Sequence, residues 1–161
     1  MIGRRPPSYD DPVAVLIFHH ANARRAAQAL LAALAAGKDA LPAVQTALEF
    51  FLGPAARHHE DEEHSVFPRL DRSPALDELC TDHRALEAIV LSLKTIAGRL
   101  PDDPAVAAEL PVHAQALEAA LAAHHAREEA EVFPAARALP PPELRAIGLE
   151  MRIRRGGEEP R

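Results

Sequence analysis

The sequence is poor in the residues that stabilise small disulfide-rich or β-rich proteins. It has a single cysteine, Cys80, which excludes an internal disulfide. It has no tryptophan, aromatic residues make up only 4% of it, and no run of alternating β-branched residues predicts a strand. Its N-terminal part contains no apolar run as long as a signal peptide or a membrane span. We therefore expect an all-α, soluble and cytoplasmic protein with no membrane partner.

An excess of positive charge is also missing. The formal net charge of −6 argues against a nucleic-acid partner, because binding to phosphate groups depends on clustered lysine and arginine. What the chain has is alanine and leucine, both strong helix formers, and hydrophobic residues make up 48% of its 161 residues. That is enough for one domain with a core. The nine histidines are many for this length, and six of them form three adjacent pairs.

Helix-start and helix-stop signals divide the chain into four long segments. An aspartate before Pro12, a glycine at position 37, and prolines at 74 and 140 to 142 mark the main boundaries. Pro54 falls inside the second segment and should kink or restart it. The expected helices are 12–36, 41–68, 74–100, 112–138 and a short 143–152. Such a pattern predicts an up-down-up-down four-helix bundle with a short C-terminal fifth helix over residues 11–155, a disordered lead over 1–10 and a disordered tail over 156–161.

Two segments of the chain, 58–68 and 124–134, resemble each other. Both contain His-His, Glu-Glu and Val-Phe-Pro at the same offsets, and in both a histidine precedes a glutamate by four positions. On an α-helix that spacing is one turn plus about 40°, so the imidazole and the carboxylate leave the same face. Together they can bind one transition-metal centre. Two such helices facing each other predict a non-haem dimetal site, with iron as the favoured metal.

The register of each pair has an alternative, because the neighbouring histidine and glutamate have the same spacing. On the fourth helix, the apolar positions Leu117 and Leu121 lead to His124 and Glu128, whereas one heptad before His125 stands a glutamate. We therefore prefer His124 with Glu128.

Repeat symmetry then selects His58 with Glu62 over His59 with Glu63. The same periodicity weakly favours His20 over His19. In this interpretation His59 and His125 flank the site as hydrogen-bonding groups or proton donors.

The order of these motifs is similar to that of a known family. A lone histidine, a His-x-x-x-Glu before Phe-Pro, a second lone histidine and a second His-x-x-x-Glu before Phe-Pro follow one another. Over roughly residues 11–155 the chain resembles the hemerythrin-like (HHE) cation-binding domain. Carried over residue by residue, the resemblance implies metal ligands at His20, His58, Glu62, His83, His124 and Glu128.

The resemblance also implies a cofactor and a class of ligand. The cofactor would be two iron ions joined by an oxo or hydroxo bridge, with manganese or zinc as alternatives, and Glu62 and Glu128 would be the bridging carboxylates. The ligand would be a small molecule such as dioxygen, peroxide or nitric oxide, which the protein binds or senses. Members of the family also include catalase-like and nitric-oxide-handling proteins and iron storage or sensing proteins, so the sequence does not establish an enzyme.

One position departs from the oxygen-carrying members. Those proteins have a second histidine one turn after the lone histidine of the third helix, whereas Glu87 stands there in this chain. Glu87 is either a seventh ligand or an ordinary residue at the surface, or at the boundary between core and surface. A metal-free helical interaction module is the remaining alternative, and it is disfavoured because carboxylates buried without a cation are costly.

Overall fold

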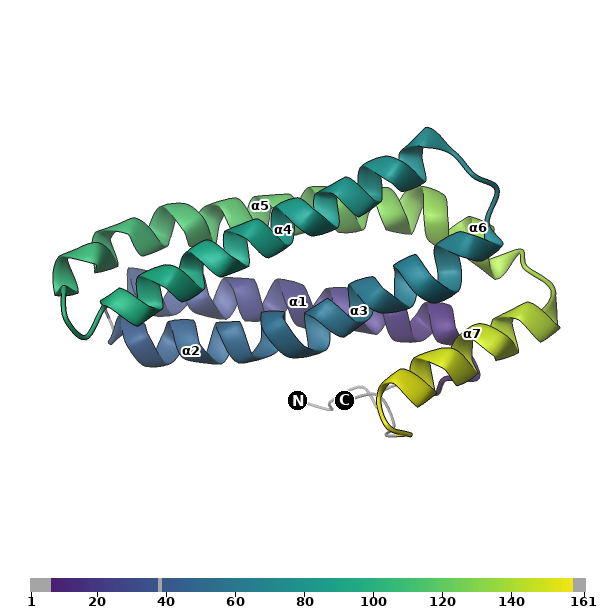
Figure 1. Ribbon diagram of the computed structural model, residues 1–161, viewed down its shortest axis with the longest axis horizontal. Coiled ribbons are helices and arrows are strands. Elements are labelled where there is room, and N and C mark those ends of the chain that lie inside the picture. The colour runs from purple at the N-terminus through teal and green to yellow at the C-terminus, as the bar shows by residue number, and fades with distance from the viewer. Residues whose placement is uncertain (1–6, 38, 158–161) are drawn as a thin grey trace.

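Four long helical segments form the bundle of the computed structural model, which describes residues 7–37 and 39–157 (Figure 1). The first is α1 (Pro12–Ala35), the third is α4 (Pro74–Arg99), and the fourth is α5 (Leu110–Arg127), η5 (Glu128–Val132) and α6 (Phe133–Arg137). In the second segment, α2 (Ala40–Phe50) packs beside α1 and α4, and α5 packs beside the same two helices. The predicted all-α, up-down-up-down class is confirmed. Residues 1–6 and 158–161 of the expected lead and tail lie outside the described residues.

Local sequence explains where the helices begin. The carboxylate of Asp11 accepts a hydrogen bond from the backbone N–H of Ala14 at 2.9 Å, and Pro12 occupies the first turn of α1. Asp103 caps the short 3₁₀-helix η4 (Pro104–Glu109), which leads into α5. After α1 the chain reverses at Gly37, whose φ of 64° is in the left-handed region that favours glycine.

The second segment is one continuous helical path rather than two helices. It contains α2 (Ala40–Phe50), η1 (Phe51–Ala55), α3 (Ala56–Asp61), η2 (Glu62–Val66) and η3 (Phe67–Arg69). Pro54 lies inside the π-helical turn η1, where the wider spacing accommodates its ring and its missing N–H. Of the two outcomes expected at Pro54, a kink or a restart, the restart does not occur, and the helix is locally distorted into a π-helical turn instead.

Both repeated segments also contain a π-helical turn, and each turn begins at a glutamate. The N–H of Phe67 donates to the carbonyl of Glu62, and the N–H of Phe133 donates to the carbonyl of Glu128. In both cases a proline follows the phenylalanine and cannot supply the next ladder hydrogen bond. Each copy of the Val-Phe-Pro motif therefore accompanies a local widening of the helix, which begins at Glu62 in one copy and at Glu128 in the other, both predicted metal ligands.

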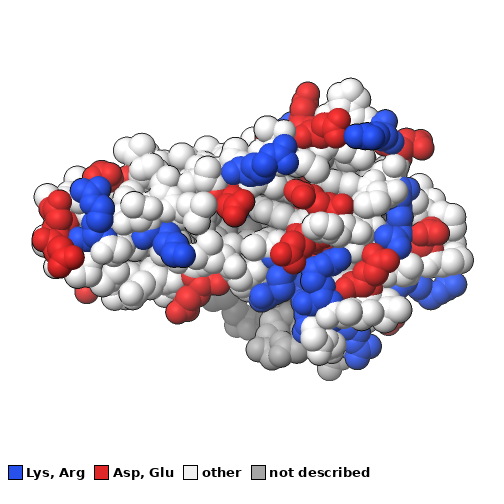
Figure 2. Space-filling model, viewed as in Figure 1, with Lys and Arg blue, Asp and Glu red and all other residues white. Residues whose placement is uncertain are grey.

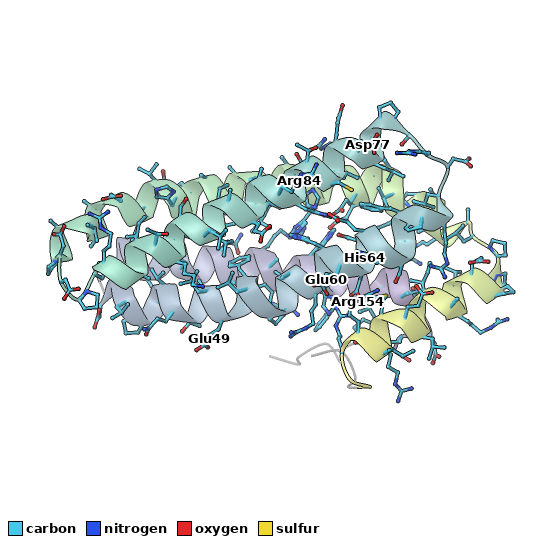
Figure 3. All side chains as sticks on the ribbon, viewed as in Figure 1. Glu49, Glu60, His64, Asp77, Arg84 and Arg154 are labelled. Atoms are coloured by element: carbon cyan, nitrogen blue, oxygen red, sulfur yellow. The ribbon has the colours of Figure 1, made fainter. Side chains whose placement is uncertain are left out.

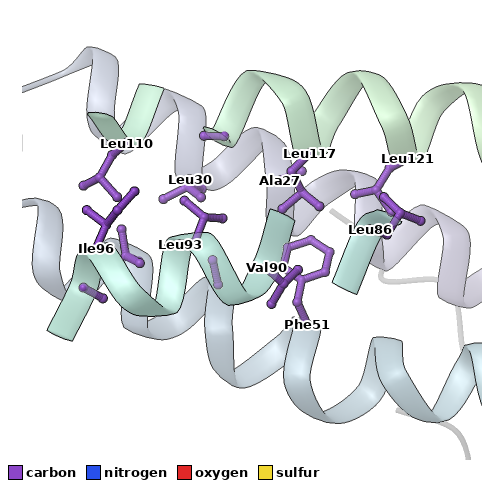
Figure 4. Packing of buried hydrophobic residues seen from close by; sticks show 14 of the residues in the cluster. Ala27, Leu30, Phe51, Leu86, Val90, Leu93, Ile96, Leu110, Leu117 and Leu121 are labelled. Carbon is purple, nitrogen blue, oxygen red and sulfur yellow. The ribbon is translucent and has the colours of Figure 1, made fainter. Parts of the chain in front are cut away.

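Two apolar clusters pack on either side of the histidine-rich zone. The larger lies between α1, α2, α4 and α5 and includes Leu30, Phe51, Val90, Leu93 and Leu117 (Figure 4). The second closes the other end of the bundle with a different set, among them Leu16, Phe67, Phe133, Ile147 and Met151. The polar centre is thus enclosed along the bundle axis by packed apolar side chains.

The fifth helix, α7 (Pro141–Arg154), lies across the end of the bundle beside α1 and α3 (Figure 1). Its residues Ile147 and Met151 are fully buried against the bundle. A Cβ on Gly148 would lie 2.0 Å from the carbonyl oxygen of Tyr9, so the close approach of these two backbones requires glycine. Figure 2 shows acidic and basic side chains interspersed over the end of the molecule that carries α7.

Ion pairs join α7 and the residue that follows it to the second segment. Arg154 and Arg155 both pair with the carboxylate of Asp61, which is fully buried. Arg69 pairs with Glu150 at 2.7 Å. None of the helices in the described part of the chain is both long and apolar enough to cross a membrane.

Candidate metal centre

The structure brings together all six residues that the sequence predicted as metal ligands. They come from every long segment of the bundle, and their side chains are at most 4% exposed. The six are His20 on α1, His58 on α3, Glu62 on η2, His83 on α4, His124 on α5 and Glu128 on η5. Residues that are distant in the sequence therefore meet in one buried polar cluster.

Two glutamates form the middle of this cluster. Nε2 of His58 lies 3.2 Å from Oε1 of Glu62, and Nε2 of His124 lies 3.2 Å from Oε2 of Glu128. These are the two predicted pairs with the i, i+4 spacing. Nε2 of His20 also faces Glu128 at 3.2 Å.

Nε2 of His83 faces Glu62 at 3.4 Å and Glu128 at 3.7 Å. Each carboxylate is thus approached by imidazoles from its own helix and from neighbouring helices. This arrangement suits carboxylates that lie between two ions.

Two further histidines join the cluster, where the sequence interpretation placed them only at its flanks. His125 groups with His20 and His58, and within this triad the potential ligand atoms lie within 4.8 Å of one another. The rings of His20 and His125 stack with centroids 3.8 Å apart.

The second triad is His59, His83 and His124, whose ligand atoms meet the same distance limit. Here the rings of His59 and His83 stack with centroids 4.0 Å apart. Each half of the centre thus offers three imidazoles, and the two central glutamates group with members of both triads.

Most of the inward-facing atoms lack a hydrogen-bond partner among the described residues. These buried atoms are Nε2 of His20, His58, His83 and His124 and both carboxylate oxygens of Glu62 and Glu128. Buried polar atoms without partners are strongly unfavourable, and several of them in one place are rare in folded proteins. Imidazole nitrogen and carboxylate oxygen are ligands that iron, manganese and zinc accept. The residues present therefore fit a pair of transition-metal ions.

Burial sets the protonation of these groups. It raises the pKa of Glu62 and of Glu128, and the charge of Glu62 raises the pKa of Glu128 further. Burial lowers the pKa of His59 to about 2 and the pKa values of His124 and His125 to about 3. These three histidines are therefore neutral near pH 7, which is the form that binds metal. A bound cation would reverse the preference of the two carboxylates and favour their charged form.

A second layer of carboxylates holds the outer nitrogens of three histidines. Nδ1 of His83 lies 2.6 Å from Glu63. Nδ1 of His20 lies 2.9 Å from Glu129. The third contact joins Nδ1 of His124 and Asp82, at 3.4 Å. When Nδ1 carries the proton, its N–H donates a hydrogen bond to the carboxylate, and the lone pair of Nε2 faces the centre.

In the sequence, Glu63 and Glu129 were candidates only as alternative ligands in a shifted register, and Asp82 was not a candidate. The signal available in the sequence was the doubled glutamate in each repeat and the aspartate directly before His83. Glu87 is exposed and stands outside the groups of neighbouring ligand atoms that the described residues form. His19 is also outside those groups, and burial lowers its pKa to about 4.

A model of the hemerythrin HHE cation-binding domain matches residues 11–136. The chain belongs to this family. The predicted resemblance is confirmed, and the buried histidines and glutamates lie within the matched residues. Neither the curated proteins nor the solved structures include a significant match to the chain. The fifth helix, α7, lies beyond the residues that the hemerythrin domain model matches.

Proposed function

We propose that this protein binds two iron ions and uses them to bind or sense a small redox-active molecule such as dioxygen, peroxide or nitric oxide. The observation that carries the proposal is the pair of fully buried glutamates, Glu62 and Glu128, set between two triads of histidines. Two adjacent carboxylates in a dry interior are unstable without cations. A di-iron pair would supply reversible one-electron and two-electron chemistry toward the small molecule.

In this proposal His20, His58 and His125 would hold one ion and His59, His83 and His124 the other, and Glu62 and Glu128, which group with members of both triads, would supply carboxylate donors between them. Iron is preferred because a mixed imidazole and carboxylate donor set is typical of non-haem iron sites, although manganese and zinc accept the same donors.

The chain's own groups have distinct roles around the ions. Glu63, Glu129 and Asp82 keep the proton of the histidines on Nδ1, which orients the rings and raises their basicity. Phe67 and Phe133 are buried at the end of the bundle and exclude water from that side. The two inner carboxylates would be ionised beside the cations and would offset part of their positive charge.

Metal analysis tests the proposal first. Protein purified from iron-replete cells without chelators should contain close to two iron ions per chain by elemental analysis. It should also show near-ultraviolet charge-transfer absorption when oxidised. Protein that contains no transition metal after iron-replete expression would overturn the proposal.

Reactivity tests it next. The reduced protein, mixed anaerobically with dioxygen, peroxide or nitric oxide in separate experiments, should change its optical spectrum with at least one of them. Stoichiometric binding of the molecule indicates a carrier or a sensor, and sustained consumption of peroxide or nitric oxide indicates an enzyme. A reduced di-iron protein that is inert toward all three would leave iron binding intact and refute the small-molecule part.

A further inference from the structure

A cavity of about 720 Å³ opens beside the metal centre. Its walls come from all four long segments, and His58, His59, His83 and His125 contribute to its lining. Any molecule in the cavity would therefore face the histidines of both triads. Protein cavities that enclose drug-sized organic ligands have volumes of roughly 300–1,000 Å³. The sequence had suggested only a small ligand such as dioxygen, peroxide or nitric oxide.

Apolar side chains form most of the remaining wall. The buried residues among them include Ala23, Phe51, Ala55, Val90 and Leu121, and each of these is at most 7% exposed. Part of this wall depends on η1, because the π-helical turn around Pro54 carries both Phe51 and Ala55. Removing apolar ligand surface from water against such a wall is favourable by roughly 25 cal/mol per Å².

Charged side chains line the cavity at its exposed edge. Glu60 on α3, Glu87 on α4 and the half-buried Glu63 contribute three carboxylates, and Arg84 on α4 contributes one guanidinium. Figure 3 shows Arg84 and Glu60 on facing helices. The edge is therefore negative overall, which favours a positively charged group there and disfavours an anion.

We propose that this cavity binds an organic cation with an apolar body, its charged group held near Glu60 and Glu87 and its apolar end directed toward the metal-binding histidines. The inference deepens the proposed function by naming a class of larger ligand for the same site, and it rests on that function only for the chemistry at the apolar end. Binding itself is measured independently of the metals.

Three probes with the same eight-carbon chain test the charge preference. Octyltrimethylammonium, octanol and octanesulfonate are titrated against N-phenyl-1-naphthylamine, a neutral fluorescent reporter, with protein of known metal content. A quaternary ammonium cannot ligate a metal, so its affinity reports the cavity alone. Octyltrimethylammonium should bind about tenfold more tightly than octanesulfonate, as expected for two exposed ion-pairing positions. Equal or stronger binding of the sulfonate would overturn the charge assignment.

Substitutions locate the binding. Val90→Phe fills the cavity and should weaken all three probes at least about tenfold, whereas Leu91→Phe, on the exposed face of the same helix, should not. Ala55→Leu, from another wall, serves as a second filling variant if Val90→Phe does not fold. Unchanged probe affinities in a folded filling variant would overturn the proposal.

A variant that removes two carboxylates tests the charge preference at the exposed edge of the cavity. Glu60→Gln combined with Glu87→Gln should remove the preference for the ammonium and leave octanol binding unchanged. Glu49→Gln combined with Asp77→Asn changes the net charge equally outside the cavity lining and should keep the preference (Figure 3). A preference retained in the first pair would contradict the proposal. If the protein contains its full complement of metal but binds none of the probes, only the proposal for the cavity is refuted. If it binds the probes but contains no metal, only the proposal for the metal centre is refuted.

Discussion

Nδ1 of His83 lies 2.6 Å from Oε1 of Glu63, although the two residues belong to different helices. Glu63 directly follows Glu62, which faces Nε2 of the same ring at 3.4 Å. The two adjacent glutamates therefore contact one imidazole ring from both sides. The inner carboxylate lies in the buried centre, and the outer carboxylate fixes the tautomer of the ring. The second repeat does the same, because Glu128 and Glu129 contact the two nitrogens of His20.

This relationship predicts that the outer carboxylates tune the metal affinity without being essential for binding. Glu63→Gln and Glu129→Gln should each lower the affinity for iron roughly 10- to 100-fold, because an uncharged amide holds the Nδ1 proton less strongly. Both variants should still bind two ions at high iron concentration. Titration against a competing chelator measures the change. Glu131→Gln, on an exposed position of η5, is the control, and affinities equal to that control would contradict the assigned role.

The inner carboxylates should behave differently. Glu62→Ala and Glu128→Ala should each lose most of the bound metal, because each removes a donor shared by the two halves of the centre. The metal-free variants should be as helical as the metal-free parent and at least as stable, since a buried carboxylate without a partner has been removed. Elemental analysis and circular dichroism measure both effects. An empty Glu129→Ala variant beside a fully loaded Glu128→Ala variant would show that the register is off by one.

The fold, and the meeting of the six predicted ligand residues in one buried cluster, could be inferred from the sequence because both depend largely on local periodicity. Proline, glycine and aspartate signals place helix ends within a few residues, and a histidine four positions before a glutamate shares its helix face. The added histidines were harder to assign. His58 and His59 point about 100° apart on a helix, so treating one of them as inward places the other at the flank. In the bundle the pair straddles the inward direction, and both rings reach the centre.

Other features depend on contacts between segments and could not be read from one chain. The partners of Glu63 and Glu129 lie on neighbouring helices, and helical periodicity does not specify which residue of another helix they meet. The cavity depends on the path of the chain around Pro54. A proline predicts a kink, but it does not predict a π-helical turn that keeps the helix continuous.

Metal removal should lower the stability of the fold. An ion that binds only the folded state stabilises it by roughly 2.7 kcal/mol at about 100 times Kd, which raises Tm by roughly 5–10 °C for a chain of this size. The iron-loaded protein should therefore melt at a higher temperature than the chelated protein, while both remain helical. Differential scanning calorimetry at matched pH measures the difference. Equal melting temperatures would indicate that no metal organises the core.

The metal-free protein should be most stable near pH 6.5. Six histidines have pKa values lowered by burial, so only the unfolded chain takes up their protons below the ordinary value of 6.5, and stability falls as the pH falls. Glu62 and Glu128 have raised pKa values, so only the unfolded chain releases their protons just above 4.5, and stability falls as the pH rises. Between 4.5 and 6.5 the histidines dominate by number, and above 6.5 only the carboxylate effect remains.

Urea unfolding of the chelated protein from pH 4.5 to 8.5 measures this profile. The metal-loaded protein should lack the decline above pH 6.5, because both carboxylates are then ionised against the cations. It should lose metal on acidification as protons compete for the histidines. A metal-free protein whose stability rises steadily to pH 8.5 would show that the two glutamates are not buried together.

The last prediction concerns α7, which lies beyond the matched family region and yet reaches the residue before Glu62. Asp61 is fully buried and pairs with Arg154 and Arg155, whose side chains are 22% and 11% exposed. Replacing both arginines by alanine leaves a buried carboxylate without its partners. Breaking such a pair costs roughly 3–5 kcal/mol, and the partial exposure of the arginines lowers the expectation to about 2–3 kcal/mol.

Asp61→Asn in the same background should recover much of that loss, because it removes the unpaired charge and keeps the size of the side chain. Urea unfolding of the parent, the double arginine variant and the triple variant measures the three free energies of unfolding. Iron affinity measured in parallel shows whether the pair also positions Glu62, since loosening α7 would displace the start of η2. If Asp61→Asn does not rescue the arginine variant, α7 is held mainly by the packing of Ile147 and Met151, and the ion pairs contribute little.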